Sequence, residues 1–226
     1  MSQVTTTGTL VKICGLRSLP EARAAVQAGA DLLGFIFWKP GKRYIAPADA
    51  ARIIQTLRAE SSHCSTVGVF VDPTVESVAE VTAECGLDYV QLSGQETRAT
   101  VEAMPRPTLK AIHVRPGGEA AAAELVASDR LGARWYLLDT HADGLPGGTG
   151  SMFDWSALRA VGPHCFVAGG LRPDNVATAL ATLGPVGVDV SSGVEFSKTE
   201  SPTGGKDPAL IRAFLEAVRT YDHRQP

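Results

Sequence analysis

The chain has 226 residues, of which 44% are hydrophobic and 20% charged, a composition typical of folded globular proteins that excludes wholesale disorder. The formal net charge of -3 gives no basic footprint for a nucleic-acid partner, and the longest apolar runs, such as residues 32–38, are far too short to cross a membrane. The four cysteines are widely spaced, with no CxxC pair or zinc-type spacing, so we expect no metal site, no disulfide framework and a cytoplasmic location.

Short β-branched runs alternate with longer amphipathic runs from one end of the chain to the other. The short runs predict eight strands: Leu10–Cys14, Leu32–Phe37, Thr66–Val71, Tyr89–Leu92, Leu109–Val114, Trp135–Asp139, Cys165–Ala168 and Val186–Val190. The first helix is expected between a cap at Ser18 and a stop at Gly29. The other predicted helices are Ala48–Glu60, Thr74–Cys85, Glu96–Met104, Glu119–Ser128, Asp154–Val161, Asp174–Leu183 and Asp207–Arg219.

These units predict an α/β protein built as a single (β/α)8, or TIM, barrel with a closed parallel sheet. Strand–helix units of about 28 residues suit this fold, and the nearly continuous apolar strands suit a sheet covered by helices. An open doubly wound sheet shares the local signals, but eight regular units favour closure. We expect residues 1–9 to be a flexible leader, 10–220 the catalytic barrel and 221–226 a tail.

Reactive side chains end two of the predicted strands. In this fold the active site lies at the carboxyl ends of the strands, where Cys14 ends the first strand and Asp139 ends the sixth. A thiol and a carboxyl group that face one cavity can divide the roles of general base and general acid. Taken alone, Cys14 also fits a buried structural thiol or a covalent nucleophile, and Asp139 also fits a turn cap.

Small residues follow the seventh and eighth strands. Gly169 and Gly170 follow the seventh strand, and Ser191 and Ser192 with Gly193 follow the eighth. These two loops are the usual phosphate site of the fold, because glycine lets backbone N–H groups approach an anion closely. We therefore predict a phosphate-binding site there.

Other residues near the predicted barrel mouth have two interpretations each. Arg43 can bind a carboxylate with its planar guanidinium or simply face water. The glycine-containing stretch 140–153 fits a mobile lid or an ordered loop, and His113 fits a barrel histidine or one that faces the pocket. Lys12 points the same way as Cys14 on the first strand, so we expect its charge to favour the thiolate.

The ordered set of motifs resembles the phosphoribosylanthranilate isomerase family over nearly the whole chain. Single pieces are weakly specific, but their order is highly specific. They are Lys12-Ile13-Cys14-Gly15, Gly34-Phe35-Ile36-Phe37, Lys42-Arg43-Tyr44-Ile45, Gly68-Val69-Phe70-Val71, Val90-Gln91-Leu92, Leu137-Leu138-Asp139-Thr140, Gly147-Gly148-Thr149-Gly150, Phe153-Asp154-Trp155, Gly169-Gly170-Leu171, Asn175-Val176, Asp189-Val190-Ser191-Ser192-Gly193-Val194-Glu195 and Gly205-Lys206-Asp207.

The resemblance implies a (β/α)8 barrel that performs an Amadori rearrangement in tryptophan biosynthesis. N-(5-phosphoribosyl)anthranilate becomes 1-(o-carboxyphenylamino)-1-deoxyribulose 5-phosphate, with Asp139 as general acid and Cys14 as general base. It further implies that Arg43 holds the anthranilate carboxylate and that the glycine and serine loops bind the phosphate. We also expect Asp189 to contact the substrate, and Ser93, at the end of the fourth strand, to contact the substrate or ordered water. We expect no cofactor or metal, because the substrate nitrogen is the electron sink, and expect a monomer or a homodimer.

The chain departs from the family pattern at three positions. Ser93 stands where the family usually has histidine, Gly41 where serine is common, and Ser151 where lysine often follows the glycine-rich loop. Two rival functions stay open: the histidine-pathway aminoaldose isomerase of the same fold, which uses two aspartates, and a phosphosugar-binding barrel without turnover. The presence of both Cys14 and Asp139 speaks against each rival.

Overall fold

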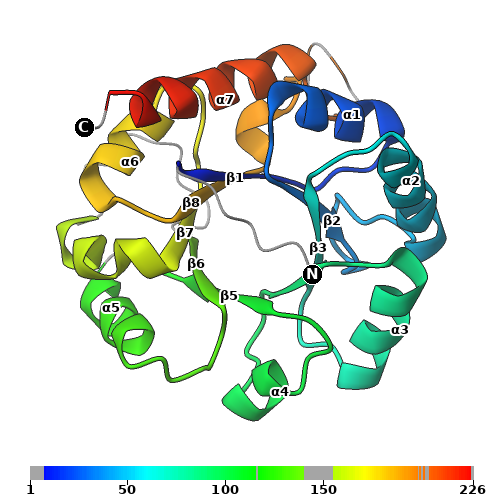
Figure 1. The fold of residues 1–226 in the computed structure, drawn as a ribbon. Helices are drawn as coiled ribbons and strands as arrows, with labels where there is room; N and C mark the ends of the chain where they lie inside the picture. Colours follow the sequence, from blue (N-terminus) through cyan, green and yellow to red (C-terminus); the bar gives the residue numbers. More distant parts are fainter. Residues whose placement is uncertain are drawn as a thin grey trace.

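The strands form a closed barrel in which each pairs in parallel with the next and β8 pairs with β1 (Figure 1). The computed structural model describes residues 8–115, 117–139, 155–197, 199, 201 and 204–224. The predicted (β/α)8 barrel is confirmed. The strands are β1 (Leu10–Cys14), β2 (Leu32–Ile36), β3 (Ser65–Phe70), β4 (Tyr89–Leu92), β5 (Thr108–His113), β6 (Trp135–Asp139), β7 (Cys165–Ala168) and β8 (Gly187–Val190).

The helices form a ring around the outside of the barrel (Figure 1). None of those within the described residues is long and apolar enough to span a membrane. The α-helices are α1 (Leu19–Ala28), α2 (Pro47–Ala59), α3 (Val75–Cys85), α4 (Arg98–Glu102), α5 (Glu119–Ala127), α6 (Val176–Leu183) and α7 (Pro208–Asp222), and the 3-10 segments are η1 (Trp155–His164) and η2 (Ser192–Val194).

The ends of α1 lie where the sequence predicts them. The Ser18 hydroxyl accepts a hydrogen bond from the backbone N–H of Glu21 (3.4 Å), which satisfies one of the free donors of the first turn. Gly29 follows the last turn with φ 90°, a left-handed conformation that side chains other than glycine rarely adopt. Both predicted boundaries of this helix are confirmed.

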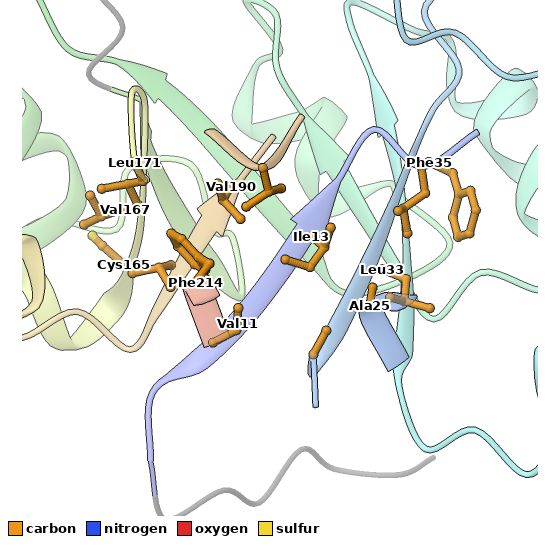
Figure 2. Packing of buried hydrophobic residues seen from close by; sticks show 14 of the residues in the cluster. Val11, Ile13, Ala25, Leu33, Phe35, Cys165, Val167, Leu171, Val190 and Phe214 are labelled. Atoms are coloured by element: carbon orange, nitrogen blue, oxygen red, sulfur yellow. The ribbon is translucent and has the colours of Figure 1, made fainter. Parts of the chain in front are cut away.

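Alternate residues of each strand face the helices or the barrel interior. Figure 2 shows Val11 and Ile13 of β1 and Leu33 of β2 in the outer core, together with Phe214 of α7 and Ala25 of α1. The other set of residues forms a separate cluster from facing strands, which fills the interior. Its buried members are Leu10, Leu32, Val67, Leu109, Ala111, Trp135, Leu137, Phe166 and Ala168.

This alternation determines which polar groups reach the barrel mouth. Successive side chains of a strand point to opposite faces, so each residue two positions beyond an interior residue is also on the inside. Lys12 and Cys14 follow Leu10 in this way, His113 follows Ala111, and Asp139 follows Leu137. The strand ends therefore direct these side chains toward one opening.

The predicted helix Glu96–Met104 is wrong at its start. The carboxylate of Glu96 accepts hydrogen bonds from the backbone N–H groups of Asp72 (3.0 Å) and Gly94 (2.9 Å), and it pairs with the buried ammonium of Lys110 (2.9 Å). Glu96 thus belongs to a tight loop, and α4 begins only after Thr97, whose hydroxyl caps the helix. Long-range charge pairing has overridden a local helical pattern.

Other boundaries differ by smaller amounts. Strands β2, β3, β5 and β8 shift by one residue at one or both ends from their predicted bounds, and α7 continues to Asp222. The predicted helix Asp154–Val161 is instead the 3-10 segment η1, which runs on to His164 and contains Pro163. Proline has no N–H and disfavours an α-helical conformation in the residue before it, which suits a tighter, irregular segment.

We predict that replacing Glu96 by leucine destabilises the protein by about 3–5 kcal/mol, because the buried Lys110 ammonium then lacks its counter-charge. Urea unfolding monitored by circular dichroism measures this change. The double variant Glu96→Leu/Lys110→Met removes both charges and should recover part of the loss. Equal destabilisation in the single and double variants would contradict an energetic role for the pair.

Candidate active site

A cavity of about 240 Å³ opens at the carboxyl ends of β6, β7 and β8. It gathers most of the site residues that the sequence predicts, from the loop after β2 to the loop after β8. Its lining consists of Arg43, Asp139, Ala168, Gly169, Gly170, Leu171, Asp189, Val190, Ser191, Ser192 and Gly193. The glycine-rich stretch 140–153, including Ser151, lies outside the described residues.

The backbones of the loops after β7 and β8 form one wall of this cavity. Gly169 and Gly170 have φ values of 91° and 67°, in the region that favours glycine. A Cβ atom on Gly193 would lie 1.8 Å from the carbonyl oxygen of Leu171, so the two loops approach each other closely only because Gly193 has no side chain. This wall therefore consists largely of backbone and small side chains, which suits the close approach of an anion.

A buried ion pair joins β1 to β8 beneath the cavity. The ammonium of Lys12, which is fully buried, lies 2.9 Å from a carboxylate oxygen of Asp189. Burial alone would lower the pKa of Lys12, but Asp189 and then Cys14 raise it above its ordinary value. Lys12 therefore remains a cation, and Asp189 is its direct partner.

Cys14 lies beside the same ammonium. A Cβ atom on Gly34 of β2 would meet the Cys14 Sγ at 2.9 Å and the Lys12 Nζ at 3.1 Å, so both atoms converge on the space that this glycine leaves open. Burial raises the pKa of the Cys14 thiol, and the charge of Lys12 opposes this only in part. Lys12 acts on Cys14 in the expected direction, because its charge lowers the pKa of the thiol, but burial raises that pKa by more.

Arg43 reaches the cavity, but its guanidinium is already paired. Its Nη2 donates to an oxygen of Glu195 at 2.9 Å, and its Nε donates to the other oxygen. Lys206 donates to the same carboxylate at 3.0 Å. Burial would raise the pKa of Glu195, but Arg43 and Lys206 lower it to about 2. Glu195 is therefore a carboxylate that holds two cations at the cavity wall.

This charge cluster is tied to the strand that carries Cys14. The Lys206 ammonium donates to the backbone carbonyl of Ser191 (2.9 Å), and the Ser191 hydroxyl donates to the carbonyl of Cys14 (3.0 Å). Ser191 thus has a structural contact in addition to its place in the cavity wall. The three segments that follow β2, β8 and η2 are held together around the end of β1.

Asp139 contacts a histidine from the neighbouring strand. The Nδ1 of His113 lies 3.4 Å from a carboxylate oxygen of Asp139, and its Nε2 lies 3.1 Å from the carbonyl oxygen of Ser93. Because a carbonyl only accepts, Nε2 carries a hydrogen. The hydrogen bond to Asp139 raises the pKa of His113 above its ordinary value. His113 therefore faces the site, and it connects Asp139 to the backbone carbonyl of Ser93, a residue outside the cavity lining.

The local sequence pattern predicted no role for Glu195 or Lys206, and it left two interpretations open for His113. The contacts with Asp139 and Ser93 favour the interpretation in which His113 faces the pocket. Glu195 and Lys206 occur in motifs of the family resemblance, yet nothing local shows that Glu195 pairs with Arg43, 152 positions away in the chain. Contacts of this range become visible only once the barrel is closed.

A closed (β/α)8 barrel with a thiol, a carboxyl group and two small-residue loops at one opening defines an enzyme that acts on a small molecule. The family model described as N-(5'-phosphoribosyl)anthranilate (PRA) isomerase matches residues 11–217. The chain belongs to this family.

Individual relatives agree with this assignment. N-(5'-phosphoribosyl)anthranilate isomerase of Desulforudis audaxviator is 45% identical over 93% of this chain and 98% of the relative, and that of Citrifermentans bemidjiense is 46% identical over 93% and 97%. The crystal structure of phosphoribosyl anthranilate isomerase from Thermotoga maritima is 33% identical, with a TM-score of 0.79 over 94% of this chain and 99% of that one.

The Glu195 cluster predicts a specific dependence of stability on pH. Its folded-state pKa of about 2 lies below the ordinary 4.5, so the group contributes stability above about pH 4.5 that is lost as the pH falls toward 2. We expect Glu195→Gln to lower the free energy of unfolding at pH 7 by about 2–3 kcal/mol, with a smaller difference at pH 3. Urea unfolding at both pH values measures this.

The exposed Glu76 on α3 supplies the control for that experiment. Glu76→Gln makes the same chemical change without removing a partner of two cations, so its effect should stay within about 0.5 kcal/mol at both pH values. A destabilisation by Glu195→Gln that does not change between pH 7 and pH 3 would contradict the charge pairing.

Proposed function

We propose that this chain converts N-(5-phosphoribosyl)anthranilate to 1-(o-carboxyphenylamino)-1-deoxyribulose 5-phosphate, the Amadori rearrangement of tryptophan biosynthesis, with Asp139 as acid and Cys14 as base. One observation carries the assignment of roles: a carboxyl group and a thiol end two inward-facing rows at the same opening, next to a cavity with a glycine- and serine-lined wall. Family membership supplies the reaction.

Asp139 is assigned to the opening of the ribose ring. Its carboxyl group lines the cavity and delivers a proton to the furanose oxygen as the C1–O bond breaks. The lone pair of the substrate nitrogen forms the C1=N bond of the resulting Schiff base, so no external electron acceptor is needed. The contact with His113 fixes one carboxylate oxygen and thereby restricts the direction of the group.

Cys14 is assigned to the second half of the reaction. Its thiolate removes the proton from C2, and the electron pair of that bond moves into the system that ends at the nitrogen, which gives an enolamine. Tautomerisation of the enolamine then yields the ketone. A buried thiolate is scarce because burial raises the thiol pKa, but it is a correspondingly strong base once formed.

The remaining predicted residues are assigned to binding. The loops with Gly169, Gly170, Ser191 and Ser192 suit the phosphate group, since they bring two backbone segments to one wall of the cavity. Arg43 keeps N–H groups beyond those bound by Glu195, and these suit the anthranilate carboxylate.

Asp189 and Ser93 are also assigned to the surroundings of the substrate: Asp189 lines the cavity, and the Ser93 carbonyl is hydrogen-bonded to His113. One solved relative, 32% identical with a TM-score of 0.74, is a complex with reduced 1-(o-carboxyphenylamino)-1-deoxyribulose 5-phosphate, which supports a phosphorylated small-molecule ligand here.

Three broader proposals accompany this function. Residues 10–220 form one catalytic domain. All four cysteines are free thiols, which supports the reducing cytoplasm as the place of action. The chain is a monomer or a homodimer; the isomerase of Thermotoga maritima is described as dimeric, and light scattering on the purified protein distinguishes the two states.

The acid role predicts that Asp139→Asn lowers kcat by roughly 10²–10⁴-fold, because an amide of the same shape has no proton to deliver to the ring oxygen. A fluorescence assay with freshly made phosphoribosylanthranilate measures the rate. Asp49→Asn, an exposed change on α2, is the matched control and should leave kcat within about twofold. Near-normal turnover by folded Asp139→Asn would remove Asp139 from the mechanism.

The base role predicts that Cys14→Ser loses most activity, because a hydroxyl group is a far poorer base than a thiolate at neutral pH. Cys64→Ser is the control, since Cys64 precedes β3 at the opposite end of the barrel. Intact-mass spectrometry during turnover should find no substrate adduct on the wild type. A covalent adduct at Cys14 would show nucleophilic catalysis and overturn this role.

A further inference from the structure

Lys12 is a single buried cation between two groups that each gain from its charge. Its ammonium lies 2.9 Å from the Asp189 carboxylate and also interacts with the Cys14 thiol. Lys12 has no exposed surface, and Cys14 and Asp189 are nearly buried. Charges interact strongly in such an environment, because little water screens them. The thiolate and the carboxylate therefore compete for one positive charge.

The competition favours the carboxylate in this structure. The ammonium of Lys12 is in direct contact with an oxygen of Asp189, at 2.9 Å, so the carboxylate is the partner that the cation already holds. Ionisation of Cys14 would then place a second anion beside one cation. The negative charge of Asp189 disfavours ionisation of Cys14 directly. Its ion pair with Lys12 also offsets the positive charge that would favour this ionisation.

The other charged groups near Cys14 do not relieve this competition. Lys206 and Arg43 are both paired with Glu195. Lys206 adds a smaller effect in favour of the thiolate. Changes at Lys12 and Asp189 leave this second cluster intact, so the two contributions are separable by mutation.

We propose that Asp189 acts as a positioning residue for the base. Its ion pair with Lys12 reduces the effect of the Lys12 charge on Cys14, and Cys14 therefore stays a thiol until that ion pair is weakened. The proposal rests on the proposed function, in which Cys14 is the base. When Cys14 ionises, its proton leaves to solvent and Lys12 stays protonated. Asp189 faces the cavity, so a ligand group can donate a hydrogen bond to it. Such a bond weakens the ion pair with Lys12, and the Lys12 charge then stabilises the thiolate of Cys14 more strongly.

The test is the pH midpoint of Cys14 alkylation by iodoacetamide, followed by peptide mass spectrometry. The midpoint reports thiolate formation, because the thiolate is the form that reacts with iodoacetamide. Asp189→Asn should lower the midpoint by about one pH unit or more, which is a tenfold gain in thiolate at any pH well below both midpoints. Lys12→Met should raise it. An unchanged or higher midpoint in Asp189→Asn would overturn the proposal.

A double variant tests whether the effect passes through Lys12. With Lys12→Met in place, Asp189→Asn should shift the midpoint much less than it does in the wild type, because no shared cation remains. An equal shift in both backgrounds would show that Asp189 acts on Cys14 directly and would overturn the role of Lys12. Should Lys12→Met not fold, the alkylation midpoint of Lys12→Gln with and without Asp189→Asn decides in the same way.

Alkylation does not measure turnover, so this result is independent of the catalytic assignment. If Cys14 is not the base, Cys14→Ser will remain active while the midpoint shift persists. If only the proposal fails, Cys14→Ser will be inactive and the midpoint will not move. The buried Cys165 at the start of β7 is the internal control; burial raises its pKa to about 12, and its midpoint should stay fixed in all variants.

Discussion

The ion pair between Lys12 and Asp189 lies at the seam where the barrel closes. These residues are register partners on β1 and β8, the first and last strands, so their contact joins opposite ends of the chain. A lone charge in this position would carry a large desolvation cost, which pairing offsets only when both strands are in register. Under the proposed mechanism, the same contact also sets how strongly Lys12 favours the thiolate of Cys14. Closure of the fold and the proposed preparation of the base then depend on one interaction.

Several charged groups around the opening form ion pairs with a residue from another strand or loop. Lys110 pairs with Glu96 behind the loop after β4, His113 with Asp139, and Arg43 with Glu195. Such pairs fix the direction of groups that would otherwise rotate freely, at the cost of removing them from water. On the sides of the opening that the described residues cover, these pairs restrain the charged groups and leave them few alternative orientations.

Sequence periodicity was sufficient for the parts of this architecture that depend on local geometry. The two-residue repeat placed Lys12 and Cys14 on one face, and the apolar runs located β6 and therefore Asp139 at its end. It could not reveal that Glu96 is a buried partner of Lys110, because a local helical pattern gives no information about a charge on another strand. The engagement of Arg43 by Glu195 and of Lys12 by Asp189 was hidden for the same reason, since both pairs join residues more than 150 positions apart.

The burial of Cys14 has a consequence for the lifetime of the enzyme. Peroxides and other oxidants attack the thiolate, and the higher acids of sulfur that follow sulfenic acid are largely irreversible. Cys14 is a buried thiol whose pKa is raised, so it offers little of the susceptible thiolate. Under the proposed mechanism, the residue that the reaction needs in its ionised form is kept in its chemically durable form, and the same packing that limits its ionisation protects it from oxidation.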